Sequence, residues 1–189
     1  MALSSIAICS RALLKLGGEP IASFEDGTAE SVAAGLLYPS TRDAVLSAYP
    51  WNFATTQKRL TRLVAKPVAD FNYAYQLPND FLRALSAGPE SRGRGIDYQI
   101  VERRLHTNAE DVTLTYIFRP HEAAFPAFFD QALIMRMAAE FCLPLTESVS
   151  RTEVLFQMAE KELRQAKLID AQQDVPPRFE ANTLIEARN

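Results

Sequence analysis

Few side chains in this 189-residue sequence have the type and position that catalysis needs. Its two histidines, His106 and His121, lie at the end of a predicted strand and directly after a proline. A histidine beside a turn is far more often a surface or hydrogen-bonding residue than a general base or metal ligand. The P-loop, nucleophile-elbow, dinucleotide-binding and HExxH zinc motifs are absent from the sequence. We therefore predict no enzyme activity, no catalytic residue, no cofactor and no metal.

Two pairs of adjacent carboxylates are the next candidates, Glu25-Asp26 and Glu110-Asp111. Paired carboxylates perform acid–base catalysis in glycosidases. Both pairs stand among turn-forming residues, however, and an aspartate there accepts hydrogen bonds from nearby backbone N–H groups. Turn formation explains both pairs more simply than catalysis does.

The two cysteines, Cys9 and Cys142, lie far apart in apolar stretches with helical spacing. Neither belongs to a CxxC motif or has a histidine beside it. We predict buried free thiols in preference to a disulfide or a ligand pair.

An arginine–glycine element, SRGRG at residues 91–95, is the candidate for nucleic-acid binding. The net charge of −3 argues against a dedicated DNA-binding protein, although residues 51–119 are mildly basic, with 10 basic and 7 acidic side chains. Two arginines release few counterions from nucleic acid. We expect a solvated loop, but a nucleic-acid site built from this loop and the aromatics of 71–83 stays open.

The first predicted helix begins at Ser4 or Ser5, either of which can cap it, and ends at Gly17-Gly18. Its apolar residues recur at spacings of three and four: Ile6, Cys9, Leu13 and Leu16. Arg11 lies in this stretch and no basic segment precedes it, so we expect a mature, cytosolic protein without a signal peptide.

A second helix is predicted to begin near Thr28 and to end before Pro50. Pro39 should kink or divide it, because proline removes a backbone donor and clashes with the preceding turn. One side of the helix carries the apolar residues Ala29, Val32, Ala33 and Leu36.

After Trp51 the apolar period changes from helical to alternating, which predicts strands in 53–63 and 71–78. Residues 98–105 and 112–118 predict a hairpin that turns at 108–111. Helical spacing returns at Phe125 and should end at Pro144. Ser150 and Glu153 form a capping box for a last long helix.

These elements predict a fold that is mainly α with a β-insert, of the α+β class. We expect an antiparallel bundle of about four helices, a small antiparallel β-sheet inserted near 52–119, and an extended C-terminal tail. The predicted division is one domain at 1–172, made of a helical body (1–51 and 122–172) and a β-insert (52–121), followed by a tail at 173–189.

The only tryptophan, Trp51, directly follows a proline at the point where the period changes. We interpret it as an anchor between the helical body and the β-insert. A tryptophan that stacks on a substrate is the other reading, and the surrounding PWNFATTQ stretch offers no nucleophile or acid–base partner for it.

Several phrases together resemble the tail tubular protein A family, the head-to-tail adaptors of T7-like short-tailed bacteriophages and related prophages. They are PWNF at 50–53, YAYQLPNDFLRAL at 73–85, YIFRP at 116–120 and FPAFFDQALIMRMAAEFC at 125–142, and the resemblance covers residues 4–172. The short region around 88–99 departs from fuller members of the family. The residues matched by two phrases are expected to be structural anchors: Trp51, Asn52, Phe53, Leu77, Pro78 and Phe81.

The resemblance implies a non-enzymatic virion protein of the tail or neck, made in the host cytoplasm. Its implied partners are a portal protein, a nozzle protein of the tail tubular protein B type, and further copies of itself in a dodecameric ring through which DNA passes without specific binding. We expect no membrane association, since no apolar run approaches the roughly 18 residues of a membrane span. A small nucleic-acid-binding or regulatory protein is the alternative, and an enzyme subunit completed by a partner is a third.

Beyond residue 172 the sequence predicts an extended tail, because Pro176-Pro177 cannot continue a helix. Its apolar residues are too sparse to form a core and are expected to dock on the portal or a neighbouring subunit: Val175, Phe179, Leu184 and Ile185.

Overall fold

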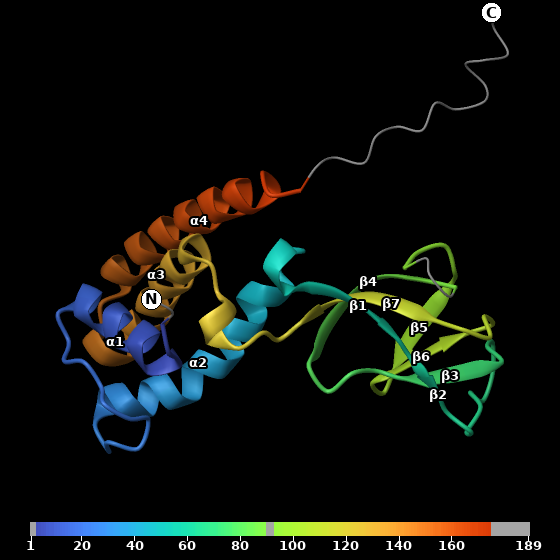
Figure 1. Ribbon diagram of the computed structural model, residues 1–189. Helices are drawn as coiled ribbons and strands as arrows, with labels where there is room; N and C mark the ends of the chain where they lie inside the picture. The colour runs from blue at the N-terminus through green and yellow to red at the C-terminus, as the bar shows by residue number, and fades with distance from the viewer. Residues whose placement is uncertain (1–2, 90–92, 175–189) are drawn as a thin grey trace, which may run out of the picture.

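The computed structural model describes residues 3–89 and 93–174, which form a helical body and a β-insert at opposite ends of the molecule (Figure 1). The α-helices are α1 (Ser5–Leu16), α2 (Ala29–Ser47), α3 (Ala127–Thr146) and α4 (Val149–Ala171). Two short 3₁₀ helices, η1 (Asn52–Ala54) and η2 (Glu122–Ala124), lie where the chain enters and leaves the insert. The predicted α+β class is confirmed.

The helical body is organised around α3, which packs against α1, α2 and α4. This helix is apolar on almost every face, as a helix covered by three others must be. Its fully buried side chains include Phe129, Leu133, Met137 and Phe141. The sequence pattern showed only one stripe of this helix, whereas the structure buries residues all around it.

The ends of the first helix follow the predicted capping chemistry. Ser4 accepts a hydrogen bond from the backbone N–H of Ala7, and Gly17 closes the helix in the left-handed region, at φ 78°. Thr28 caps α2 in the same way, through the N–H of Ser31. Local residues therefore determine where α1 ends and where α2 begins.

The sequence predicted that Pro39 would kink or divide the second helix. Pro39 lies inside α2 and does not divide it, because buried side chains on both sides of the proline, Tyr38 and Val45 among them, hold the helix on the body. That packing outweighs a local cost of about 3 kcal/mol. The prediction that the third helix ends at Pro144 was wrong: Pro144 lies in the last turn of α3, where little of the hydrogen-bond ladder remains to be lost, and the helix ends at Thr146, with Glu147 as its C-cap.

The last helix also begins earlier than predicted. Its cap is Ser148, whose hydroxyl accepts from the N–H of Arg151, and the predicted Ser150–Glu153 box is not the start. The reason is the preceding residue: Glu147 adopts φ 54° and turns the chain directly from α3 into α4. No helix in the described part of the chain is long and apolar enough to cross a bilayer.

The β-insert contains two antiparallel sheets where one was predicted (Figure 1). The three-stranded sheet has the order β1 (Thr55–Arg59), β7 (Thr113–Phe118), β4 (Phe81–Gly88). The four-stranded sheet has the order β2 (Thr61–Arg62), β3 (Tyr73–Gln76), β6 (Arg104–Thr107), β5 (Tyr98–Val101). Strand β4 has no counterpart among the predicted strands.

The predicted hairpin between 98–105 and 112–118 was wrong. The hairpin is β5–β6, which turns at Glu102 and Arg103, with φ angles of 48° and 60°. Two successive residues with positive φ make the two-residue turn that best fits the twist of paired strands. Strand β7 pairs instead with β1 and β4 in the other sheet.

Candidate docking groove

Trp51 lies at the junction between the two parts of the molecule and is completely buried. Its indole Nε1 donates a hydrogen bond to the carbonyl oxygen of Val45 in α2, at 3.1 Å. Its ring meets those of Tyr49 and Phe129 edge to face, at centroid distances of 5.0 and 5.1 Å. The indole therefore contacts the end of α2 and the start of α3 together, and no face of it is open to a substrate.

The neighbouring Asn52 ties the same junction to the far end of the chain. Its backbone N–H donates to Oδ2 of Asp170 at 2.9 Å, and its side-chain Nδ2 donates to the backbone oxygen of Asp170 at 2.7 Å. Asp170 is fully buried, and that burial raises its pKa while the Asn52 hydrogen bond opposes the rise. This clamp joins the C-terminal end of α4 to the entry of the β-insert.

Phe53 completes an aromatic cluster at the junction. Its ring lies 4.9 Å from that of Phe129 and 6.0 Å from that of Phe125, both in edge-to-face arrangements. Such pairs add to the hydrophobic gain from burial. Trp51 and Phe53 therefore share one aromatic cluster, and Asn52 between them joins the junction to Asp170.

The other three predicted anchors lie in a separate place, the core of the β-insert. Leu77 and Pro78 are buried, and the ring of Phe81 stacks on Tyr116 at a centroid distance of 6.0 Å. The carbonyl oxygen of Pro78 accepts a hydrogen bond from the N–H of Phe81, which forms the turn before β4. The two phrases therefore stabilise two different cores.

A network of charged groups fastens the exit of the insert to α2. Arg42 pairs with Glu122 at 2.9 Å, Tyr38 donates to the same carboxylate at 3.1 Å, and Arg119 pairs with Asp43. Burial opposes ionisation of Glu122, but hydrogen bonds from its own backbone, Arg42 and Tyr38 outweigh this and lower its pKa. Entry and exit of the insert are both held against the helical body.

The histidine and carboxylate residues that were considered for catalysis make hydrogen bonds and ion pairs that hold turns and strands in place. The His121 side chain is 84% exposed, and its Nδ1 accepts from the N–H of Ala123 at the start of η2. Asp26 accepts from two backbone N–H groups of the turn before α2, at 2.8 and 2.9 Å. Asp111 pairs with Arg59 on the neighbouring strand. Within the described ranges, no group of three histidine, cysteine or carboxylate side chains could hold a metal.

The remaining candidates are Cys9, Cys142, His106 and Glu110. Both cysteines are free and buried, as predicted, and burial raises the pKa of Cys9 to about 12. A thiol with that pKa is not a nucleophile at neutral pH. His106 is half-buried in β6, and Glu110 accepts from the hydroxyl of Tyr73 at 3.3 Å.

Two residues of the arginine–glycine element, Ser91 and Arg92, lie outside the described residues. Gly93 is buried, and its carbonyl oxygen accepts hydrogen bonds from the hydroxyls of Ser86 and Thr115. A Cβ atom at Gly93 would lie 2.2 Å from the Thr115 hydroxyl oxygen, so only glycine fits this close approach. Gly93 is therefore held on the three-stranded sheet, whereas Arg94 and Gly95 are exposed, as expected for a solvated loop.

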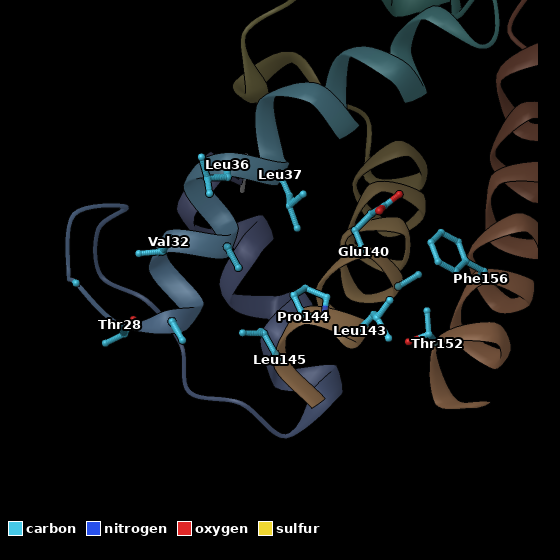
Figure 2. A pocket seen from close by; sticks show the side chains of 14 residues that line it. Thr28, Val32, Leu36, Leu37, Glu140, Leu143, Pro144, Leu145, Thr152 and Phe156 are labelled. Carbon is cyan, nitrogen blue, oxygen red and sulfur yellow. The ribbon is translucent and has the colours of Figure 1, made fainter. Parts of the chain in front are cut away.

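An apolar groove of about 800 Å³ lies between α2 and α4, with the end of α3 between them (Figure 2). Figure 2 shows Leu37 of α2 and Phe156 of α4 on opposite sides, with Leu143 and Pro144 of α3 between them. The other lining residues are Gly27, Thr28, Ala29, Val32, Ala33, Leu36, Ala139, Glu140, Leu145 and Thr152. We call this surface the α2–α4 groove.

Several large apolar side chains along this groove are open to solvent. Val32 is 53% exposed, Leu36 73% and Leu143 48%. Single exposed apolar residues are ordinary, but a contiguous apolar hollow marks a surface that binds another chain or ligand. The stripe of α2 residues noted in the sequence borders this groove: Ala29, Val32 and Leu36 are exposed, and Ala33 also packs against the core.

A second, more polar cleft lies beside the groove along α4. The two share Leu37 and Glu140, and the cleft is further lined by Ser40, Thr41, Ala44, Val45, Ala48, Arg136, Glu160, Leu163 and Lys167. Arg136 pairs with Glu140 on its own helix and with Glu160 of α4, at 2.8 and 3.7 Å. The lining therefore changes from apolar in the groove to charged in the neighbouring cleft, toward the C-terminal end of α4.

The predicted tail residues Val175, Phe179, Leu184 and Ile185 lie outside the described residues. Comparison of the chain with protein-family models and with curated proteins finds no match.

Proposed function

We propose that this protein is a virion structural protein, a head-to-tail adaptor that forms a ring between the portal and the tail nozzle of a short-tailed bacteriophage or related prophage. The observation that carries the proposal is the α2–α4 groove. It is a large apolar surface on a subunit whose core is otherwise closed, and it suits docking of another protein segment. The resemblance of the PWNF, LPNDFLR and YIFRP phrases to tail tubular protein A supports the same role.

The arrangement of the subunit fits an adaptor between two assemblies. The helical body and the β-insert lie at opposite ends (Figure 1), so each end can meet a different partner. Trp51, the Asn52–Asp170 clamp and the Arg42–Glu122 pair hold the two parts together. A subunit that carries load between portal and nozzle needs such a rigid junction.

The charge of the chain is compatible with a ring that surrounds DNA. A strongly basic lumen would bind phosphates and hold the genome in transit. The net charge of −3 avoids this, and DNA would pass without specific binding. The partners are then the portal protein, a nozzle protein of the tail tubular protein B type and further copies of this chain, in a dodecameric ring. The place of the protein is the neck of the virion.

Mass spectrometry of purified particles tests this proposal. We expect peptides of this chain in gradient-purified virions and in tail complexes released from them, in a constant ratio to the portal protein. Particles that infect normally and contain none of this chain would overturn the proposal.

A further inference from the structure

We infer that, in the assembled ring, the α2–α4 groove binds helix α4 of a neighbouring copy of this chain. The inference rests on the proposed function, because the ring supplies the neighbour. Two surfaces of the helical body lead to it. One is the groove, and the other is an exposed apolar row on the far side of α4.

The second surface runs along α4. Val154 is 54% exposed, Met158 50% and Leu168 67%. Spacings of four and three residues connect these positions through Lys161 and Gln165, which are exposed as well. Residues with this spacing lie on one side of a helix. We call this row the α4 ridge.

The ridge and the groove lie on opposite sides of α4. Phe156 borders the groove (Figure 2), and Val154 and Met158 are each two positions away from it. Because 3.6 residues complete a turn, two positions correspond to about 200°, slightly more than half a turn. A chain therefore cannot place its ridge in its own groove, but it can present the ridge to one neighbour while its groove receives another.

The two surfaces are complementary in shape. The ridge is convex, and the groove is a hollow of about 800 Å³ between two helices. An amphipathic helix binds such a groove through anchors at positions i, i+4 and i+7. Val154, Met158 and Lys161 have this spacing. Methionine suits the central position, because its flexible side chain fills irregular hollows.

The charges favour a parallel arrangement of neighbouring α4 helices. In that arrangement Val154 and Met158 lie in the apolar groove. Lys161, one turn further along, then lies beside Glu140, which borders both the groove and the charged cleft. Opposite charges at this boundary would fix the register of the ridge in the groove.

A contact between two different surfaces of one subunit repeats from neighbour to neighbour and can close a ring. Its apolar part consists of a few half-exposed side chains on each surface and is well below the roughly 1,000 Å² of a stable interface. The contact is therefore too weak to join free subunits. On a portal, where neighbours are held side by side, their high effective concentration makes it sufficient.

Disulfide formation in rings assembled on the cognate portal tests the inference. The double variant Leu36→Cys/Met158→Cys has one cysteine at the groove and one on the ridge. The native Cys9 and Cys142 are buried and stay out of the reaction. The matched control is Leu14→Cys/Met158→Cys, because Leu14 is exposed on another helix of the body, α1. Each variant is oxidised mildly, with and without portals, and separated on a non-reducing gel.

We expect covalent dimers and higher oligomers of the groove variant on portals, because a disulfide forms only where two Cα atoms lie within about 7 Å. Without portals the groove variant should remain monomeric, and the control should remain monomeric in both conditions. Rings on portals that yield only monomers on the gel would overturn the inference. A control that cross-links as fast as the groove variant would overturn it too.

Opposite charges at the same two positions provide a second test. Leu36→Lys and Met158→Glu change exposed side chains, so each single variant should fold normally while leaving portals bare. The double variant should restore rings, because the two introduced charges then face each other across the contact. A double variant that binds portals no better than either single variant would overturn the inference.

Finding the protein in purified virions is a separate result. Failed cross-linking and failed charge rescue, with the protein present in virions, reject the contact between ridge and groove and leave the proposed function standing.

Discussion

The helical body and the β-insert bury their apolar residues in different ways. In the body, α3 is enclosed by three helices, yet α2 and α4 leave an apolar groove between them. In the insert, two sheets enclose a small core that includes Tyr75, Leu105 and Leu114. Its most exposed large apolar side chains are Val64 and Val68, in the loop between β2 and β3.

This contrast separates the apolar surface that is buried within the subunit from the apolar surface that is left free to bind a partner. The insert is held on the body through the buried cluster around Trp51 and through ion pairs at its exit. The body carries the open apolar surface. Substitutions at the junction should therefore reduce stability, whereas substitutions at the groove should affect assembly alone.

The largest effect is expected for Trp51→Ala. Removing a fully buried indole leaves a cavity among α2, α3 and Phe53, and should lower the free energy of unfolding by roughly 3–5 kcal/mol. Urea denaturation followed by circular dichroism measures this change. Val64→Ala, at a fully exposed position, is the control and should have almost no effect. Unchanged stability of Trp51→Ala would show that the indole does not anchor the junction.

A smaller loss is expected at the clamp. Asp170→Ala leaves the backbone N–H of Asn52 without its acceptor and should cost about 1–3 kcal/mol in the free energy of unfolding. Asp170→Asn keeps a side-chain oxygen in place and should cost less. If both variants unfold at the same urea concentration as the wild type, the hydrogen bond contributes nothing to the junction.

Asp130 should make stability depend on pH. Burial raises its pKa to about 6, against a usual value of 3.8, although Arg11 opposes the shift. The folded state therefore holds a proton that the unfolded chain releases, so this contribution is complete below about pH 4 and is lost as the pH rises through about 6.

Asp130→Asn should remove that loss and be more stable than the wild type at pH 7, by about 1–3 kcal/mol, with the difference shrinking toward pH 4. Thermal unfolding at several pH values measures it. A difference between variant and wild type that stays constant from pH 4 to pH 7 would contradict the assignment.

The smallest effect on stability is expected at the groove. Leu36→Asp replaces a side chain that is 73% exposed and should change the free energy of unfolding by less than about 0.5 kcal/mol. It should nevertheless abolish assembly, because it places a charge in the apolar α2–α4 groove. Leu14→Asp, at an exposed position on α1, is the matched control. Sedimentation of each variant with portals compares them, and equal binding would separate the groove from assembly.

Much of the helical body could be predicted because its signals are local. Ser4 and Gly17 lie beside the helix ends that they cap, and the change of period at Trp51 marks the junction within a few residues. The pairing of β7 with β1 could not be read in this way, because the partners Thr55 and Ile117 lie far apart in the sequence. The same holds for the contact between Asn52 and Asp170.

The groove was missed for another reason. Val32 and Leu36 show that α2 has an apolar side, but a helical pattern does not reveal whether another helix covers that side. The sequence signal was present, and the decision between core and surface depends on how far α4 lies from α2.

Negative-stain imaging of the purified protein, alone and mixed with its cognate portal, tests the adaptor role most directly. No heptad seam is long enough to enforce a stable oligomer. The account predicts separate subunits in the protein alone and a ring of this protein on the portal in the mixture. Portals that remain bare at saturating protein would contradict the adaptor role, and stable rings without a portal would contradict assembly on a template.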